Sequence, residues 1–135
     1  MFRYKRRVEF AETDMAGIVH FSMYFRYMEE AEHALWRAAG LSIATPGAPV
    51  GWPRVSAACD FKAPLHFEDE FEVTVDIARV ARRTIEYVFT IILGGRAIAS
   101  GSISVACVRK TPGQPMRSTD LPPDIVAKLQ AVLGA

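Results

Sequence analysis

The stretch ETDMAGIVHFSMYFRYMEEAEHALWRAAG, residues 12–40, joins a short polar turn to the longest periodic segment of the chain. From Ser22 to Ala39, apolar residues recur at intervals of three and four, which is the period of an α-helix with one buried face. Ser22 has the side-chain oxygen preferred at an N-cap, and Gly40 follows the segment, as is common after the last residue of a helix. The stretch therefore predicts a helix of about five turns.

Strand-like segments lie on both sides of this helix. Phe2 to Phe10 roughly alternates between apolar and charged side chains, which predicts a first strand. Four later segments are rich in β-branched and aromatic residues: 54–61, 70–80, 84–93 and 96–108. Gly94-Gly95 separates the last two, and two glycines in a row favour a hairpin turn because both can adopt positive φ. A short helix is expected at 124–133.

These elements predict an α+β domain in which the long helix covers one face of an antiparallel sheet, because neither can bury its apolar face alone. Within segment 84–93, the residues expected to face inward are Ile85, Tyr87, Phe89 and Ile91. The opposite face of that segment is too apolar at its end to be fully solvated. We therefore expect part of it to contact another copy of the chain.

Length, charge and cysteine content limit the classes of function. With 135 residues, half of them apolar, the chain fits a single domain over 1–135. Its formal net charge of +1 argues against a general nucleic-acid binder. Cys59 and Cys107 are too few for a disulfide scaffold, and the sequence has neither the apolar run of a signal peptide nor one long enough for a membrane span. A cytoplasmic protein with reduced thiols is expected.

The polar turn before the helix carries a specific motif. Asp14 and Gly17 are spaced as D-x-x-G, two aliphatic residues and the pair His20-Phe21 follow, and the helix continues as YFRYME. At a strand-to-helix junction, this pattern resembles the motif of the 4-hydroxybenzoyl-CoA thioesterase family, which belongs to the hotdog-fold acyl-CoA thioesterases. The resemblance covers nearly the whole chain. It implies an α+β hotdog fold, in which an antiparallel sheet wraps around one long central helix.

The resemblance also implies roles for three residues of this motif. In the family, the aspartate matching Asp14 either attacks the thioester carbonyl as a nucleophile or activates water as a general base, and both roles need an ionised carboxylate. A backbone N–H at the start of the helix, here that of Phe21, stabilises the developing oxyanion. Gly17 is expected to let the backbone pass close to the substrate, because it has no Cβ. Without the resemblance, Asp14 would be interpreted as an ordinary Asx-turn or capping residue.

Three further residues are candidates for substrate binding, each with a competing structural interpretation. His20 is either a base or substrate contact, or a packed, hydrogen-bonded histidine. Tyr24 either lines the acyl pocket or belongs to the core. Glu29 matches an acidic position of the family pattern and either orients a neighbouring group or forms an ion pair. Three residues later, where relatives often carry arginine, this chain has Glu32, so an ion pair built on that arginine is in doubt. His33 is assigned to surface pairing with Glu29, and no metal site is expected.

A basic cluster is the candidate for coenzyme A. Arg79, Arg82 and Arg83 lie between two predicted strands, near the hairpin at which relatives bind CoA phosphates, and the guanidinium group suits phosphate. A charged turn that only keeps the sheet edge soluble is the competing interpretation. No cofactor is expected, since coenzyme A is part of the substrate. The resemblance further implies a homodimer or homotetramer with the acyl pocket between the helix and a partner subunit.

The prediction is therefore a thioesterase that hydrolyses an acyl-CoA to a free acid and CoA. Two alternatives stand beside it: a thioesterase acting on acyl carrier protein, and a non-catalytic module that binds acyl thioesters. Asp14 argues against the module, because a binder gains nothing from an ionised carboxylate beside a thioester carbonyl. Dehydration or hydration of an acyl thioester needs a motif that the sequence lacks. Aromatic, short and long acyl groups all stay open at this point.

Overall fold

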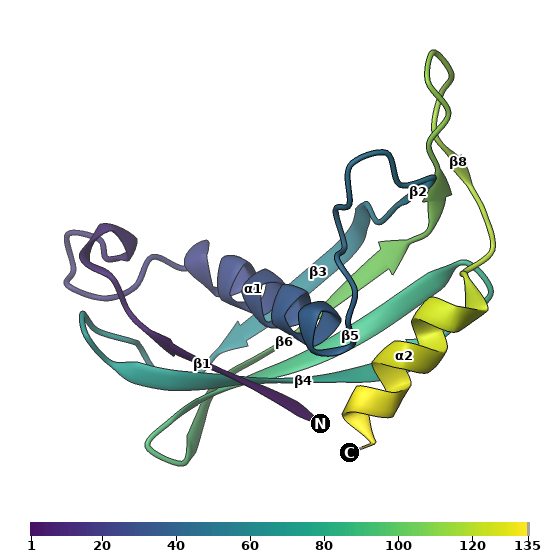
Figure 1. Ribbon diagram of the computed structural model, residues 1–135. Helices are drawn as coiled ribbons and strands as arrows, with labels where there is room; N and C mark the ends of the chain where they lie inside the picture. The colour runs from purple at the N-terminus through teal and green to yellow at the C-terminus, as the bar shows by residue number, and fades with distance from the viewer. Residues whose placement is uncertain (135) are drawn as a thin grey trace.

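The chain forms an antiparallel sheet of five strands in the order β1-β4-β5-β6-β3. The computed structural model describes residues 1–134 and is shown in Figure 1. The strands are β1 (Phe2–Arg7), β3 (Arg54–Phe61), β4 (Glu70–Val80), β5 (Thr84–Leu93) and β6 (Arg96–Ala106). β1 and β3 lie at the two edges, so each of them has one free side along which its backbone has no neighbour in this sheet.

Helix α1 (Met23–Ala38) lies against one face of this sheet, and the sheet curves around it (Figure 1). The four residues predicted to face inward from β5 are each at most 2% exposed: Ile85, Tyr87, Phe89 and Ile91. Gly101 of β6 gives the edge strand and the helix room to approach, since a Cβ there would lie 2.6 Å from the backbone oxygen of Ala58. The prediction of an α+β domain with the helix on one face of the sheet is confirmed.

The two predicted glycine signals are also confirmed. Gly94 and Gly95 have φ angles of +58° and +78° and connect β5 to β6, with Leu93 paired to Arg96 across the turn. Gly40 has a φ of +77° directly after the end of α1. Both sites use the left-handed conformation that glycine adopts without steric cost.

The N-terminal region differs from the prediction in two places. β1 ends at Arg7 rather than at Phe10, and residues Phe10–Glu12 form a 3-10 helix, η1. The strand stops because its partner β4 begins at Glu70, opposite Arg7. The predicted side-chain cap of α1 is wrong as well: the Ser22 hydroxyl makes no capping hydrogen bond and lies 2.8 Å from His20 Nδ1 instead.

Three short strands form a second sheet that the sequence did not predict. They are β2 (Val50–Gly51), β7 (Val108–Arg109) and β8 (Arg117–Ser118), in the order β2-β7-β8. The predicted strand 96–108 is thereby split: β6 ends at Ala106, opposite Thr84 where its partner β5 begins, and Val108 and Arg109 pair with β2 and β8.

The C-terminal helix α2 (Pro123–Leu133) packs against the end of the domain, and Leu129 is its fully buried residue. It lies close to the N-terminus, where the Met1 ammonium donates to the carbonyl of Leu133 at 2.7 Å. Neither α1 nor α2, nor any other helix within residues 1–134, has the length and apolar character needed to cross a membrane.

Candidate active site

Asp14 lies in a tight hairpin, the Asp14 loop (residues 13–20), through which the chain passes from β1 to α1. The Asp14 N–H donates to the carbonyl of Ile18 at 2.9 Å, and the Gly17 N–H donates back to the carbonyl of Asp14 at 3.0 Å. Gly17 has a φ of +81°, and a Cβ on it would meet nothing within 4 Å in this chain. The conformation of the turn therefore accounts for the glycine. Its predicted close approach to substrate remains a prediction.

The two carboxylate oxygens of Asp14 have different surroundings. Oδ1 accepts a hydrogen bond from the backbone N–H of Ala16 at 2.9 Å, which is an Asx-turn. Oδ2 accepts no hydrogen bond from any group within residues 1–134. The side chain is only partly exposed. One oxygen thus fixes the orientation of the carboxylate, while the other is free to meet a carbonyl carbon or a water molecule.

The start of α1 presents one unpaired backbone donor beside this loop. Among the backbone N–H groups of residues 20–24, only that of Phe21 has no acceptor within residues 1–134. The Phe21 side chain is 63% exposed, so substrate can reach this part of the backbone. A free N–H at a helix N-terminus suits a developing negative charge, because the helix dipole adds to the hydrogen bond.

His20 takes part in a local hydrogen-bond arrangement. Its Nδ1 lies 2.8 Å from the Ser22 hydroxyl and accepts the Ser22 backbone N–H at 3.3 Å. Because Nδ1 is an acceptor, the hydrogen-bond pattern assigns the proton of the neutral ring to Nε2. The ring packs against Phe21, with centroids 4.7 Å apart. His20 is thus a hydrogen-bonded histidine that presents an N–H donor to its exposed side.

Tyr24 belongs to the core, and it touches an aromatic residue that the sequence reading did not single out. Tyr24 is 3% exposed, and its ring lies edge-on to that of Phe61 with centroids 5.0 Å apart. Phe61 is the last residue of the edge strand β3 and is about half exposed. An apolar surface therefore leads from the start of α1 to the free edge of the sheet.

Glu29 takes part in an ion-pair cluster between α1 and β3. Arg54 Nη2 lies 3.0 Å from the Glu29 carboxylate, and Arg54 Nη1 donates to Glu32 at 3.0 Å. Glu32 is 1% exposed, and burial raises the pKa of its carboxyl although Arg54 opposes that rise. Glu32, which stands where relatives often carry arginine, is thus paired with an arginine from another element, Arg54 of β3. The predicted pairing of Glu29 with His33 is not observed among the described residues, since His33 lies 3.9 Å from Glu32.

The arginine cluster lies far from Asp14 within one chain. Arg82 and Arg83 each lie 3.0 Å from Asp120, and the hydrogen bond from Arg83, with Arg82 beside it, holds the pKa of Asp120 below its usual value. They lie in the turn after β4 and Arg79 lies at the end of β4 itself, whereas the Asp14 loop lies at the other end of that strand (Figure 1). An eleven-residue strand separates the two ends by about 30 Å. One copy of the chain does not bring these candidates together.

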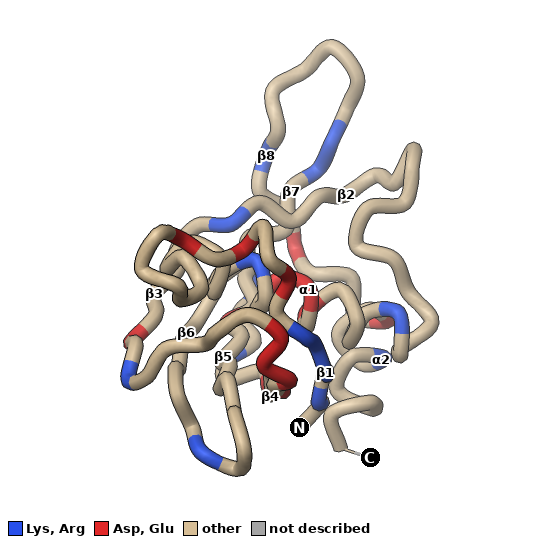
Figure 2. The backbone as a smooth tube through the Cα atoms, turned by 90° about the vertical axis from the view of Figure 1, so that its left-hand side faces the viewer, with Lys and Arg blue, Asp and Glu red and all other residues tan. Residues whose placement is uncertain are grey.

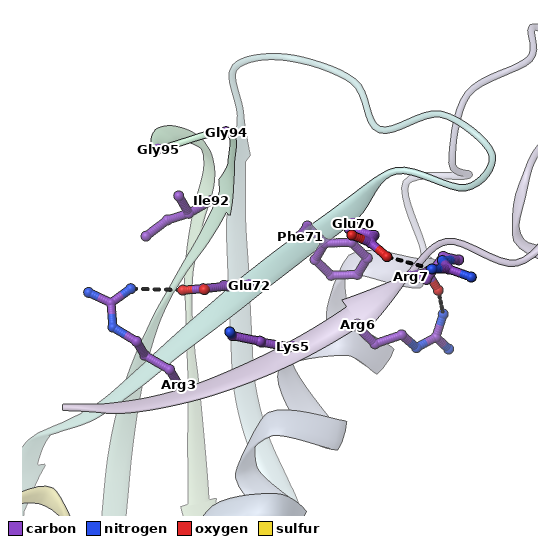
Figure 3. Close-up of a pocket in the computed structure, with 10 residues that line it drawn as sticks. All are labelled: Arg3, Lys5, Arg6, Arg7, Glu70, Phe71, Glu72, Ile92, Gly94 and Gly95. Atoms are coloured by element: carbon purple, nitrogen blue, oxygen red, sulfur yellow. Dashed lines mark hydrogen bonds and ion pairs between the residues drawn. The ribbon is translucent and has the colours of Figure 1, made fainter.

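A large cavity of the single chain also lies away from Asp14. It is a hollow of about 630 Å³ on the sheet face opposite α1, bounded by β1, β4 and the β5-β6 hairpin (Figure 3). Arg3 pairs with Glu72 and Arg7 with Glu70 along it, and Figure 2 shows these basic and acidic strands side by side. Paired charges line this hollow, so it does not suit an apolar acyl group.

The cysteines do not supply a nucleophile. Burial, together with the charge of the neighbouring Asp60, raises the pKa of the Cys59 thiol to about 11, and burial raises the pKa of Cys107 as well. Both thiols are therefore protonated at neutral pH. Within residues 1–134, no three His, Cys, Asp or Glu side chains come together as ligands for a metal ion.

Comparison with known proteins identifies the family to which this arrangement belongs. The model of the thioesterase-like superfamily matches residues 8–129, which include the Asp14 loop, the whole of α1 and the five-stranded sheet from β3 onward. The chain belongs to the thioesterase-like superfamily. Its members share the hotdog fold, so the predicted fold is confirmed.

Individual relatives agree with this membership. A 1,4-dihydroxy-2-naphthoyl-CoA hydrolase of Synechococcus sp. is 31% identical over 108 residues, which cover 73% of this chain and 71% of the relative. A crystal structure of a hypothetical protein from Aquifex aeolicus has a TM-score of 0.88 at 30% identity and covers 96% of this chain and 99% of its own. The structure of a gentisyl-coenzyme A thioesterase has a TM-score of 0.84 at 29% identity, with 94% and 98% covered.

The predicted class of enzyme is confirmed: the chain is a thioester hydrolase. The finer resemblance to the 4-hydroxybenzoyl-CoA thioesterase family goes beyond this match and remains a prediction.

Proposed function

We propose that this chain hydrolyses an acyl-CoA thioester to a carboxylic acid and CoA, and that Asp14 carries the reaction. The observation that supports this most strongly is the carboxylate itself, which has one oxygen held by Ala16 and the other free. It lies on the loop that ends at the unpaired N–H of Phe21. Carboxylate and donor are the two groups that thioester hydrolysis needs: one to deliver the oxygen and one to stabilise the oxyanion.

Two sequences of bond changes fit this pair of groups. In the first, Asp14 attacks the carbonyl carbon, the C–S bond breaks to release CoA as a thiolate, and water then hydrolyses the acyl-aspartyl anhydride. In the second, Asp14 takes a proton from a water molecule, whose oxygen attacks the carbonyl directly, and the C–S bond then breaks to release the acid and the CoA thiolate. In both, the Phe21 N–H donates to the carbonyl oxygen as it becomes negative, which is typically worth about 2.7–4 kcal/mol of barrier. Thiolate leaves readily, so a strong general acid is not required.

An aromatic acyl group is the substrate class that we propose. The Synechococcus relative is named for a dihydroxynaphthoyl thioester and the related solved structure for a gentisyl thioester, and both acyl groups are hydroxylated aromatic rings. In this chain the exposed ring of Phe61 lies edge-on to Tyr24, and Phe21, which is also exposed, lies three residues before Tyr24 at the start of α1. Such rings suit a planar aryl group, which can stack face-to-edge against them. The 4-hydroxybenzoyl group falls within the same class.

We further propose that the complete site forms between two copies joined along β3. Most of β3 is exposed, including Val55 and Phe61, and its outer edge has no partner within residues 1–134. Arg54 lies at the end of β3 opposite Phe61 and pairs with Val105 of β6. Val105 pairs in turn with Ile85 of β5, which lies close in sequence to Arg82 and Arg83. Antiparallel pairing of two β3 edges would place the Asp14 end of one copy beside the arginine end of the other.

This arrangement would account for the distance between Asp14 and the arginine cluster within one chain. The arginine cluster of one subunit would hold the CoA phosphates, while Asp14 of the other subunit reaches the thioester. A homodimer is the smallest unit that works in this way, and a homotetramer can contain two such pairs. A cytoplasmic location is compatible with a CoA substrate and stands as part of this proposal.

The experiment that tests the function is release of free thiol from a panel of acyl-CoAs: benzoyl, hydroxybenzoyl and naphthoyl thioesters beside short and long alkanoyl ones. Hydrolysis with the highest kcat/KM for the aryl thioesters is expected. Higher kcat/KM for alkanoyl thioesters would overturn the aryl proposal, and turnover of none would overturn the activity. The same acyl group on acyl carrier protein, and on CoA lacking its 3′-phosphate, distinguishes the two thiol carriers.

A further inference from the structure

A buried carboxylate, that of Glu12, lies two residues before Asp14 and is not used by the proposed reaction. Glu12 is the last residue of η1 and only 7% exposed. A charged side chain is rarely buried unless its environment supplies partners of opposite charge and hydrogen bonds. The partners of Glu12 therefore indicate what the residue does in this position.

Side chains from two elements, β1 and α1, hold the Glu12 carboxylate. Arg6 of β1 donates from Nη1 to Oε1 and from Nη2 to Oε2, both at 2.6 Å. The Tyr27 hydroxyl of α1 donates to Oε1 at 2.9 Å, and the backbone N–H of Glu9 donates to the same oxygen at 2.9 Å. The guanidinium of Arg6 also lies over the Tyr27 ring, 4.9 Å from its centroid. These four residues, with Glu30 below, are called the Glu12 anchor.

The anchor holds Glu12 through an ion pair and several hydrogen bonds. Burial alone would raise the pKa of Glu12, but the hydrogen bonds from Arg6, Glu9 and Tyr27 outweigh it and hold the pKa below its usual value. Arg6 is fixed in turn by Glu30, whose carboxylate accepts from Nε at 3.0 Å. A bidentate arginine–carboxylate pair is both stronger and more directional than a single hydrogen bond. The side chain of Glu12 is therefore locked relative to β1 and α1.

The backbone of Glu12 connects this locked side chain to both ends of the Asp14 loop. The Glu12 carbonyl accepts the backbone N–H of His20 at 2.9 Å, which fixes the residue just before Phe21. The next residue, Thr13, pairs with Val19 across the hairpin. Asp14 follows directly. The loop that carries the carboxylate and the residue that leads to the oxyanion donor thus leave from one anchored point.

We propose that Glu12, held by hydrogen bonds from Arg6 and Tyr27, is a positioning residue that sets the distance between the Asp14 carboxylate and the Phe21 N–H. This inference rests on the proposed function of Asp14. The reacting groups must be held in near-attack geometry, and a displacement of about 1 Å can lower the rate about 100-fold. Loosening the anchor should lower kcat and leave KM unchanged, because Glu12 lies behind the loop and does not touch substrate.

The test uses Tyr27→Phe and Glu12→Gln, with Tyr87→Phe as a matched control. Tyr87 is, like Tyr27, a fully buried tyrosine, and its hydroxyl accepts a hydrogen bond from Trp36 Nε1 at 3.0 Å, near the other end of α1. Tyr27→Phe should lower kcat about threefold to tenfold, and Glu12→Gln about tenfold or more, with KM within twofold of wild type. Tyr87→Phe should lose comparable thermal stability and keep the wild-type kcat.

Wild-type kcat in Tyr27→Phe and Glu12→Gln, with only a lower Tm, would overturn the inference, and if Glu12→Gln does not fold, Tyr27→Phe decides. A double-mutant cycle adds a reading that a purely structural role would not give: in an Asp14→Asn background, Tyr27→Phe should have little further effect on residual turnover. Turnover retained by Asp14→Asn alone would overturn the proposed function and this inference with it. Turnover lost by Asp14→Asn but kept by both anchor variants would overturn the inference alone.

Discussion

Asp14 combines two interpretations that compete at the level of the sequence. An aspartate two residues before an Ala-Gly pair is either an Asx-turn residue or a reactive group. In the structure, Oδ1 forms the Asx-turn with Ala16 and Oδ2 is left free within residues 1–134. The turn therefore serves the chemistry, because it holds the carboxylate in one orientation without occupying both of its oxygens.

Gly17 offers a prediction about this turn. Replacing Gly17 by alanine should cost about 1–2 kcal/mol of stability, because its φ of +81° is unfavourable for an L-residue, although a Cβ would have space. If the chain avoids that cost by shifting the loop, kcat falls as well. Thermal unfolding and kcat of Gly17→Ala measure the two effects. Gly17→Asn is the control and should be milder, since asparagine tolerates positive φ. Equal stability of wild type and Gly17→Ala would contradict this account.

At the scale of single residues, the sequence predicted Asp14 and Phe21 through a local motif, but not their supports. The partners of Glu12 and Glu32 are Arg6 on β1 and Arg54 on β3, which no spacing along the chain reveals. Phe61 was missed for the same reason, since its contact with Tyr24 exists only once β3 lies beside α1. Pairing between distant segments depends on the folded structure, and a single sequence carries no direct signal for it.

The helix α1 carries two acidic contacts that should respond to pH in opposite directions. Burial raises the pKa of Glu32, so its contribution to stability is fully present below the unfolded value of about 4.3 and is lost as pH rises through the folded value. The pKa of Glu12, whose carboxylate accepts from Tyr27, is lowered, so its contribution is present above about 4.3 and is lost as pH falls through the folded value.

Denaturant unfolding of wild type, Glu32→Gln and Glu12→Gln across acidic to neutral pH tests this assignment. Relative to wild type, Glu32→Gln should become less destabilising as pH rises above about 4, and Glu12→Gln more destabilising over the same direction. In Glu32→Gln, a changed hydrogen bond to Arg54 would shift the free energy of unfolding by the same amount at every pH. Parallel pH profiles for the three proteins would contradict the pKa directions.

At the scale of elements, long periodic segments were predictable and short ones were not. Three strands, β3, β4 and β5, have the predicted bounds, and α1 and α2 begin or end within one residue of theirs. Alternation, helical period and the Gly94-Gly95 turn are local signals, which explains this agreement. The two-residue strands β2, β7 and β8 have no periodicity to detect. η1 has a capping box between Glu9 and Glu12, and Arg6 of β1 also binds the Glu12 carboxylate.

For the whole molecule, mixing of subunits tests whether Asp14 and the arginine cluster of one site come from two different copies of the chain. If each site combines Asp14 of one copy with the arginines of the other, then Asp14→Asn and an Arg79→Ala/Arg82→Ala/Arg83→Ala variant should complement each other. In a mixed dimer, one site receives an intact Asp14 and an intact arginine cluster, and the other site receives neither. After random reassortment of equal amounts, about a quarter of all sites should be complete.

The measurement is turnover at low acyl-CoA concentration, before and after the two variants are unfolded and refolded together. Alone, the arginine variant should have a raised KM and Asp14→Asn a low kcat. The folding of the arginine variant should be little affected, because the pairs that Arg82 and Arg83 make with Asp120 are exposed. Recovery of turnover after mixing is expected. Activity no greater than the sum of the separate variants would place both groups in one subunit or remove the arginines from the site.

The central claim is that the free carboxylate oxygen of Asp14 performs the hydrolysis, and kcat of Asp14→Asn beside wild type tests it most directly. The substitution is nearly isosteric, and the asparagine carbonyl can still accept the Ala16 N–H, so the turn is kept while the ionised oxygen is lost. With an aryl-CoA substrate, we expect kcat to fall at least about 100-fold while Tm and oligomeric state stay at their wild-type values. A kcat within a few-fold of wild type would contradict the account, because hydrolysis would then not depend on this carboxylate.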